Sequence, residues 1–338
     1  MSVSRVEIVV PARNEERVIA RTLRALLPSS PWPFRWHLTV ADGRSGDATA
    51  AIASAVDPDN VSVVPNHLTL QSCGVNMVAL SLPDDVDVVV RADAHCVYPP
   101  DFVASVVAAL ERSGADSVVV AMHSRSGEGS AFGRATAAAQ NSRLGNGGAS
   151  HRNAGRSGFV DHGHHAAFRR EAFAALGGYD ETFSHNEDAE FDLRMAAAGR
   201  KVFLDGGSTI GYLVRETPAA LARQYFAYGA GRARTVLKHN KVRLRQIAPA
   251  VVTAGNAACL LLSPLLPWTL AAPALYAAAC LALGAAASGA KGAERLAGIP
   301  AMIMHHAWGA GFLSTMARTM TPPAAIRLLG GLVQRAVP

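Results

Sequence analysis

Short apolar runs rich in β-branched residues recur along the first part of this 338-residue chain. They lie at residues 6–10, 37–41, 61–64, 86–90 and 117–121, and helical spacing of apolar residues follows the first four. Strands that alternate with helices in this way favour a mostly parallel sheet with helices on both faces. We therefore expect an α/β fold with three layers, helix–sheet–helix.

The next part of the chain carries more varied signals. Residues 123–159 are rich in Gly, Ser, Asn and Arg, which predicts a long loop with one helix inside it. A short helix is predicted at 168–175, and a second one at 186–195 has acidic residues in its first turn, where the helix dipole favours them. After a strand at 201–204, Thr217 and Pro218 predict the start of a further helix.

Polar residues collect directly after three of the predicted strands. These segments are Pro-Ala-Arg-Asn-Glu-Glu at 11–16, Asp-Gly-Arg-Ser-Gly-Asp-Ala-Thr at 42–49 and Arg-Ala-Asp-Ala-His at 91–95. In open α/β sheets, ligands bind at the edge where parallel strands end. Asp93 and His95 could hold a divalent cation there, and the cation could hold a diphosphate. The alternative is that both are solvated loop residues.

Charge and cysteine content narrow the class of protein. The net charge is +6, and basic residues are concentrated just before an apolar tail, as Arg232, Arg234, Lys238, Lys241, Arg243 and Arg245. Such a cluster is typical of the cytoplasmic side of a membrane span and suits anionic headgroups. We expect no nucleic-acid partner, since aromatic interleaving and a known motif are lacking. The four cysteines show no CxxC spacing, which favours reduced thiols, and the N-terminus shows no signal peptide, which favours a cytoplasmic first region.

The C-terminal part of the chain is uncharged over long stretches. Residues 247–268, 271–290 and 296–317 are each long enough to cross a bilayer, and we expect two to three transmembrane helices. Prolines predict that the first segment is kinked or partly re-entrant, and the first two segments could form a hairpin. An odd number of spans would put the basic C-terminus outside, so one segment could lie in the interface instead. The alternative for each segment is a buried helix of a soluble protein.

These patterns divide the chain into three regions. We expect an α/β domain at 1–215, an interfacial helix with a basic juxtamembrane segment at 216–245, and a helical membrane region at 246–338.

Four motifs in order carry a resemblance to a known family. They are the three strand-end segments and Asn-Glu-Asp-Ala-Glu-Phe at 186–191. The chain resembles the family 2 glycosyltransferases, which are inverting enzymes of the GT-A fold that use nucleotide-activated sugars. Asp-Ala-His in place of the usual Asp-x-Asp, followed by Tyr-Pro, is most similar to the succinoglycan-biosynthesis branch. The resemblance covers nearly the whole chain and implies a Rossmann-like, three-layer nucleotide-sugar domain followed by membrane helices.

The resemblance implies roles for the residues at the strand ends. Pro11, Arg13 and Glu15 would line the nucleotide pocket. Asp42 would accept a hydrogen bond from the base, which favours a uracil N–H and hence a UDP-linked donor. Asp93 would contact the ribose and the metal side of the diphosphate.

The resemblance also implies a metal site and a catalytic base. His95 stands where the family has its second metal-binding aspartate, so Asp93 and His95 would hold Mn²⁺ or Mg²⁺. A divalent cation offsets the negative charge of a departing diphosphate, and an imidazole nitrogen favours Mn²⁺. Asp188 would be the base, because a carboxylate at a helix start suits deprotonation of an acceptor hydroxyl on the face opposite the leaving group. Attack from that face inverts the anomeric carbon.

Further residues are assigned to the acceptor or diphosphate side. They are Glu187 in the acidic helix start, and Arg223, Gln224 and Tyr228 where processive relatives carry Gln-x-x-Arg-Trp. That motif is not intact here, because no Arg-Trp follows Gln224. Transfer of a single sugar is therefore favoured over polymerisation.

Simpler roles stay open for several acidic residues. Asp42 and Asp47 could cap the following helix, and Glu187 and Glu190 could complement the helix dipole.

Histidines and tyrosines also allow simpler roles. His162, His164 and His165 have the look of a metal cluster, but a substrate-loop or packing role is favoured. Tyr225 and Tyr228 could be aromatic residues at the membrane interface.

We therefore expect a metal-dependent, inverting glycosyltransferase with a cytoplasmic catalytic domain and a multi-pass anchor in the inner (cell) membrane. It would transfer a sugar to a lipid-linked or polysaccharide-precursor acceptor, within a polysaccharide-assembly complex. One alternative is a non-catalytic membrane scaffold of such a complex. Another is a sugar nucleotidyltransferase, which would carry a Gly-rich phosphate loop after the first strand that residues 11–16 lack.

Overall fold

A mixed β-sheet forms the centre of the first of two units. The computed structural model describes residues 2–148, 155–242, 244–287 and 292–319. The first unit consists of Met1–His123 and Ser150–Leu213, and the second of Ser124–Ala149 and Val214–Pro338. The sheet has the strand order β3-β2-β1-β4-β8-β6-β9-β5, and β7 also pairs with β9. The strands are β1 (Arg5–Ala12), β2 (Arg35–Asp42), β3 (Val61–Pro65), β4 (Val88–Arg91), β5 (Cys96–Val97), β6 (Ser117–Arg125), β7 (Gly158–Phe159), β8 (His164–Arg169) and β9 (Val202–Leu213).

Strand direction changes in the middle of the sheet. The strands β1 to β4 run parallel to one another, as expected. Strand β8 is antiparallel to both β4 and β6, and β5 and β7 are antiparallel to β9. The expectation of a mostly parallel sheet is therefore wrong for this half. The predicted helix at 168–175 is also partly wrong, because Phe168 and Arg169 end β8.

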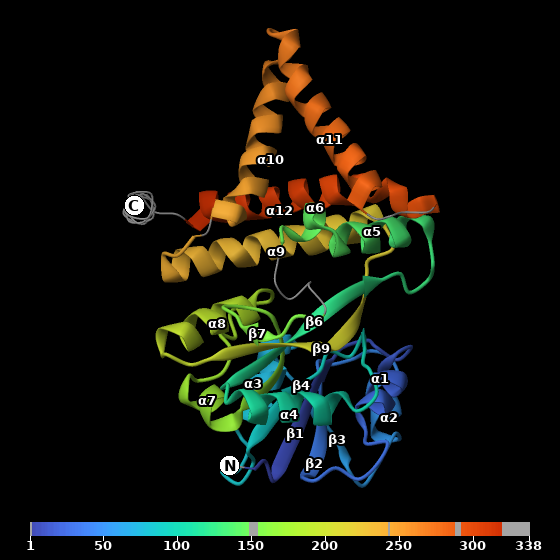
Figure 1. Cartoon of the computed structure of the whole chain (residues 1–338), viewed down its shortest axis with the longest axis vertical. Helices are drawn as coiled ribbons and strands as arrows, with labels where there is room; N and C mark the ends of the chain where they lie inside the picture. The colour runs from blue at the N-terminus through green and yellow to red at the C-terminus, as the bar shows by residue number, and fades with distance from the viewer. Residues whose placement is uncertain (1, 149–154, 243, 288–291, 320–338) are drawn as a thin grey trace. The chain divides into compact units, whose positions relative to one another are not determined.

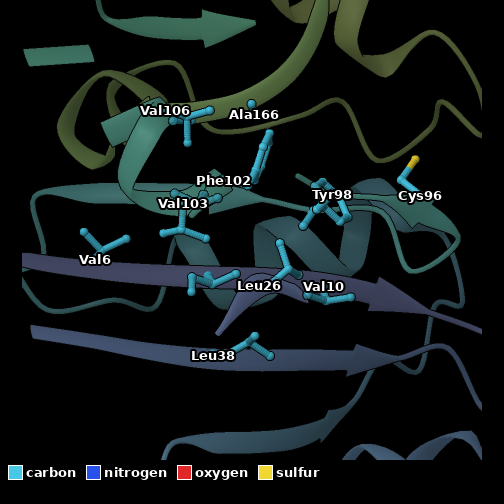
Figure 2. Packing of buried hydrophobic residues seen from close by; sticks show 14 of the residues in the cluster. Val6, Val10, Leu26, Leu38, Cys96, Tyr98, Phe102, Val103, Val106 and Ala166 are labelled. Carbon is cyan, nitrogen blue, oxygen red and sulfur yellow. The ribbon is translucent and has the colours of Figure 1, made fainter. Parts of the chain in front are cut away.

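Helices cover both faces of the sheet, which confirms the three-layer arrangement. Those of the first unit are α1 (Ile19–Leu26), α2 (Thr49–Ser54), α3 (Gln71–Ala79), α4 (Phe102–Ser113), α7 (Arg170–Ala175) and α8 (Glu187–Ala197). Because side chains alternate along a strand, Val6 and Val10 of β1 pack with α1 and α4 on one face, as Figure 2 shows. Val9 packs on the other face with residues of α3 and α8.

The second unit is helical within its described residues. Its elements are α5 (Ala131–Asn141), α6 (Arg143–Asn146), α9 (Pro218–His239), α10 (Leu244–Leu262), the 3₁₀ turn η2 (Pro267–Leu270), α11 (Ala271–Ala287), the 3₁₀ turn η3 (Gly292–Ala297) and α12 (Gly298–Thr319). The helix predicted from Thr217 and Pro218 is confirmed as α9, and the Thr217 hydroxyl accepts the Ala220 N–H at 3.3 Å.

Two glycines let α9 and α12 approach closely. A Cβ at Gly229 would overlap the Trp308 carbonyl, and one at Gly311 would overlap the Phe226 carbonyl. In Figure 1, α12 runs along α9, while α10 and α11 form a hairpin that leaves this layer. The third predicted span, 296–317, thus lies mostly in a helix that packs along α9 within the unit.

Membrane-crossing potential is more limited than expected. Among the described residues, only Pro267–Ala286 is long and apolar enough to cross a bilayer, with a mean hydropathy of 1.7. The apolar part of α10, Gln246–Leu262, is shorter. The structure therefore supports one candidate span where two to three were predicted.

A buried carboxylate lies on the sheet, near the start of β1 and β2. Glu7 is almost completely buried. Its Oε1 accepts the Thr39 hydroxyl at 2.6 Å and lies 3.1 Å from Nδ1 of His37. This hydrogen bond with Glu7 raises the pKa of His37 above its ordinary value, against the opposing effect of partial burial.

We expect His37→Gln to destabilise the protein more at about pH 6 than at about pH 9. Because the folded pKa of His37 is raised, its contribution is complete below the unfolded pKa and is lost as pH rises through the folded value. A hydrogen bond to a charged group contributes about 2 kcal/mol, which partial exposure of His37 reduces to about 1 kcal/mol. Thermal unfolding midpoints across this pH range measure the effect. The exposed His67→Gln is the control, and an equal loss at both pH values would contradict the assignment.

Candidate active site

Three of the predicted site segments meet at one edge of the sheet. In the parallel register, Ala12 of β1 pairs with Asp42 of β2, and Val9 of β1 pairs with Arg91 of β4. The ends of β2 and β4 therefore flank the end of β1. Pro11 is partly buried within β1, and Arg13 lies exposed just beyond it.

Asp42 and Asp47 organise the loop between β2 and α2. Asp42 Oδ1 accepts the Ser45 hydroxyl at 2.6 Å, and its Oδ2 accepts the Ser45 N–H at 3.1 Å. Asp47 Oδ1 accepts the Thr49 hydroxyl at 2.5 Å and the Thr49 N–H at 3.0 Å, at the start of α2, and these bonds, chiefly the one from the hydroxyl, lower the pKa of Asp47. The Thr49 hydroxyl in turn accepts the Glu15 N–H at 2.7 Å, so the loops after β1 and β2 hold each other.

Asp93 is a buried carboxylate between β4 and β5. Its Oδ1 accepts a hydrogen bond from Nε2 of Gln71 at 2.7 Å and lies 3.3 Å from Nη2 of Arg91. Its Oδ2 lies 3.6 Å from Nε2 of His164. Burial alone would raise the pKa of Asp93, but Arg91 and the nearby histidines outweigh it and lower the pKa to about 2. Asp93 is therefore an anion at neutral pH.

His95 joins the loop after β4 to the loop after β1. Its Nδ1 lies 3.1 Å from Oε1 of Glu15, and its ring meets Tyr212 edge-on. Glu15, predicted to line the nucleotide pocket, and His95, a predicted metal ligand, are thus in direct contact. More than a third of the His95 side chain is exposed, so it is accessible to a ligand from solvent.

The donor set suits a divalent cation that brings other ligands with it. Within the described ranges, no three His, Cys, Asp or Glu side chains are grouped so that they could enclose a metal ion. Mg²⁺ and similar ions in phosphate sites commonly take one or two protein ligands and complete their shell with phosphate oxygens and water. Asp93 and His95 fit this kind of site, with one oxygen and one nitrogen ligand.

Arg91 is a buried cation that contacts both sides of the site. Its Nη2 lies 3.3 Å from Oδ1 of Asp93 and 3.3 Å from Oε1 of Glu187. Its Nη1 donates to the Tyr179 hydroxyl at 3.1 Å. The guanidinium therefore brings the carboxylate after β4 and the first residue of α8 to one place.

The first turn of α8 presents two adjacent carboxylates in different states. Asn186, just before the helix, has the left-handed backbone conformation with φ 64°. Burial raises the pKa of Glu187, against the effect of Arg91, and the Asp188 charge raises it further. For Asp188, the attraction of His162, His165 and Arg91 outweighs burial, so its pKa is far below the ordinary value. Asp188 is also the more exposed of the two.

The three histidines at 162–165 do not form one cluster. His165 lies with Nδ1 2.7 Å from the Tyr179 hydroxyl and Nε2 2.9 Å from Asp192 Oδ1, and His162 Nδ1 lies 2.7 Å from Asp192 Oδ2. His164 faces Asp93 instead, and burial lowers the pKa of His164 to about 4, so its ring is neutral at neutral pH. The favoured packing role fits His165, which is completely buried.

Sequence reasoning missed three polar contacts of this site. It assigned no role to Arg91 or Gln71, and to His164 only a substrate-loop or packing role shared with two other histidines, although all three residues contact Asp93. A signal for Arg91 was present, because an arginine that directly ends a buried strand next to an aspartate needs a partner for its charge. Nothing local marks Gln71, which precedes Asp93 by 22 residues.

Residues assigned to the acceptor side lie in both units. Glu187 belongs to the cluster around Arg91 in the first unit. Arg223, Gln224 and Tyr228 lie on α9 in the second unit, where Gln224 Nε2 donates to the Tyr228 hydroxyl at 3.1 Å. Their assignment to the acceptor stays a prediction.

Comparisons with known proteins agree on the family and the fold. A model of the family "Glycosyl transferase family 2" matches residues 7–177. The succinoglycan biosynthesis protein ExoA of Rhizobium meliloti (strain 1021) is 42% identical over 311 residues, which cover 90% of this chain and 93% of ExoA. The mannosyltransferase PcManGT from Pyrobaculum calidifontis, solved with GDP-Man and Mn²⁺, is 19% identical with a TM-score of 0.61, over 95% of this chain and 89% of that chain. The motifs, the GT-A-like mixed sheet and these matches lead to one conclusion: this chain belongs to the family 2 glycosyltransferases.

Proposed function

We propose that this glycosyltransferase moves one sugar from a UDP-linked donor to a lipid-linked or polysaccharide-precursor acceptor, with inversion at the anomeric carbon. The reaction takes place at the cytoplasmic face of the inner membrane. Its family and its 42% identity to a succinoglycan biosynthesis protein support a role in polysaccharide assembly. Other enzymes of such an assembly are the partners that this role implies.

The observation that carries the proposal is the double contact of Arg91. One guanidinium nitrogen lies 3.3 Å from both Asp93 and Glu187. Asp93 follows β4, at the edge of the sheet where the sugar donor would bind. Glu187 precedes Asp188 in the first turn of α8. The proposed diphosphate ligand and the proposed base therefore belong to one charged cluster, as a displacement at a single carbon requires.

Asp93 and His95 are the residues that would hold the metal ion. A bound divalent cation supplies charge that offsets the negative charge building up on the departing diphosphate. The nitrogen ligand favours Mn²⁺ over Mg²⁺, and Mn²⁺ is present in the PcManGT structure. Glu15 would orient the His95 ring through its contact with Nδ1.

Asp188 is the proposed base. Its lowered pKa keeps it ionised at neutral pH, so it can accept a proton from an acceptor hydroxyl. Arg91 and the histidines that lower this pKa make Asp188 a weak base in the ground state. Proton transfer then follows as the attacking oxygen becomes acidic in the transition state. Attack of that oxygen from the Asp188 side breaks the bond to the diphosphate on the other side.

The nucleotide would lie over the ends of β1 and β2. Pro11, Arg13 and Glu15 would line this pocket, and Asp42 would accept a hydrogen bond from the uracil N–H. The bonds from Ser45 to Asp42 hold the carboxylate in place for this role.

The acceptor side and the membrane belong together in this proposal. Arg223, Gln224 and Tyr228 of α9 would contact the acceptor or the diphosphate. Lipid-linked acceptors stay in the bilayer, so an apolar segment such as Pro267–Ala286 keeps the enzyme where its substrate is.

A screen of nucleotide sugars for UDP release tests the whole proposal. The purified full-length protein is assayed with Mn²⁺, with and without membrane lipid extract. Release of UDP that rises with lipid extract is expected. A non-catalytic scaffold would release no UDP with any donor, and a sugar nucleotidyltransferase would instead produce pyrophosphate from UTP and a sugar phosphate.

We expect Asp188→Asn to lower kcat by about 10²–10⁴-fold, because an amide cannot accept the hydroxyl proton. Binding of UDP should stay within about twofold, since Asp188 does not contact the nucleotide in this proposal. Turnover and UDP titration measure the two effects. Glu171→Gln is the matched control, because Glu171 is an exposed acid in the first turn of α7. Normal turnover of Asp188→Asn would show that another group is the base.

We expect Arg91→Lys to lower kcat on the order of 10²-fold, because an ammonium cannot bridge Asp93, Glu187 and Tyr179 at once. The thermal midpoint should also fall, because buried carboxylates lose a partner. Arg5→Lys is the control, since Arg5 pairs with Asp85 at the surface. A lower midpoint with unchanged kcat at low temperature would mean that Arg91 only stabilises the fold.

His95→Asp tests the metal assignment. An oxygen ligand in place of nitrogen should retain activity and move the preference from Mn²⁺ towards Mg²⁺. The ratio of turnover with the two ions, measured across their concentrations, gives the result. An unchanged ratio would return His95 to a loop role through its contact with Glu15.

A further inference from the structure

The hairpin of α10 and α11 exposes an unusual amount of apolar surface. Residues 246–290 contain no charged side chain. Large apolar side chains are exposed along both arms and at the turn, namely Val251, Leu260, Leu261, Leu262, Leu265, Leu266, Trp268, Leu270, Leu275, Leu281 and Leu283. Apolar surface on this scale marks a contact with a membrane or another protein.

The part of each arm that lies farthest from the turn packs against α12 of the same unit. Ala250 of α10 is 3% exposed and packs with Phe312 and Met316 of α12. On α11, Cys280 is 3% exposed, and a Cβ at Gly284 would overlap the backbone of Gly298 at the start of α12. The two ends of the hairpin, the start of α10 and the end of α11, therefore both pack against α12.

The exposed length of each arm is short compared with a bilayer. The exposed stretches run from about Val251 to Leu262 and from Ala271 to about Leu283. At 1.5 Å rise per residue, each arm extends about 20 Å, whereas the hydrocarbon layer is about 30 Å thick. Pro267–Ala286 is long enough to cross by residue count, but its last turns are packed against α12 and η3.

The turn between the arms satisfies its own polar groups. The N–H groups of Leu265 and Leu266 both donate to the Leu262 carbonyl, at 3.0 and 2.9 Å. Pro264 and Pro267 have no N–H to satisfy. The Thr269 hydroxyl lies 2.8 Å from the carbonyls of Leu266 and Cys259, and so joins the turn to α10. A turn in contact with water or headgroups has no need of this, whereas a turn in hydrocarbon does.

Basic residues mark the side from which the hairpin starts. Lys241 is exposed just before α10, and Arg295 is exposed just after α11, in η3. Basic side chains at both ends of the hairpin suit the anionic headgroups of a cytoplasmic leaflet. Between Leu260 and Leu266, Ser263 is the only residue with a polar side chain. Its hydroxyl donates to the Leu260 carbonyl at 2.8 Å.

We propose that the α10–α11 hairpin is re-entrant: it enters the bilayer from the catalytic side and turns inside the hydrocarbon, without reaching the opposite surface. The inference rests on the proposed membrane association and specifies its form. Both ends of the hairpin then lie on the same side of the membrane, and the enzyme reaches its acceptor from a single leaflet.

Labelling of an introduced cysteine in sealed vesicles of both orientations tests the proposal, because the native cysteines other than Cys259 are buried. Leu265→Cys at the turn is compared with Asp59→Cys, an exposed site in the first unit, both in a Cys259→Ala background. A membrane-impermeant maleimide should label Asp59→Cys from one side only. Labelling of Leu265→Cys should be about a tenth of that or less from either side, and should become complete in detergent.

Tryptophan fluorescence gives the depth of the turn independently. Trp268 is 73% exposed in the hairpin, so lipids brominated at mid-chain should quench it more than lipids brominated near the headgroup. Trp268→Phe supplies the signal of the other tryptophans for subtraction.

Three other outcomes would overturn the proposal in distinguishable ways. Labelling of Leu265→Cys from the side opposite to Asp59→Cys means that the hairpin crosses, and membrane association stands. Labelling from the same side, in a protein that resists alkaline carbonate extraction, means that another segment is the anchor. Release by carbonate removes the membrane part of the proposed function as well.

Discussion

The buried guanidinium of Arg91 is the constraint on which the site depends. A cation removed from water is costly unless it is paired on several sides. Here the partners come from three places: Asp93 after β4, Glu187 at the start of α8, and Tyr179 in the segment between α7 and α8. Segments far apart in sequence are thereby held at fixed distances around one group. The same contact that stabilises the fold sets the geometry of the site.

The charge balance around Arg91 explains the different states of the acids. Arg91 favours the charged form of Asp93, Glu187 and Asp188, and His164 is neutral at neutral pH. Glu187, the carboxylate next to the Asp188 charge, is the one whose pKa is raised. A nucleotide diphosphate would add further negative charge at Asp93. In the proposed function, a divalent cation held by Asp93 and His95 would offset this charge when the nucleotide binds as well as when the leaving group departs.

Sequence patterns predicted one half of the sheet and the order of the motifs, because β1 to β4 are β-branched runs that end in polar loops. They did not predict β8, whose His-His-Ala-Ala core lacks β-branched residues and owes its conformation to pairing with β4 and β6. The contact of Gln71 with Asp93 was invisible for the same reason, since it arises from the tertiary arrangement. For Arg91 the sequence indicated the need of a partner but not which residues would supply it. Hydropathy also suggested a span at 296–317. It cannot show that Gly311 in this segment fits against the backbone of α9.

The second unit takes its parts from two separate stretches of the chain, and this affects how the protein can be shortened. Ala139 of α5 is covered by Leu221 of α9 and by Ala297, Ala301 and Met304 near the chain's end. Removing everything after β9 would leave α5 in place, because it precedes β8, but would strip its apolar face of cover. Such a truncated protein is expected to aggregate, even though its sheet is intact. Replacing only the exposed part of the α10–α11 hairpin, nearest its turn, with a polar turn leaves the residues that cover α5 in place. This is the better route to a water-soluble form of the enzyme.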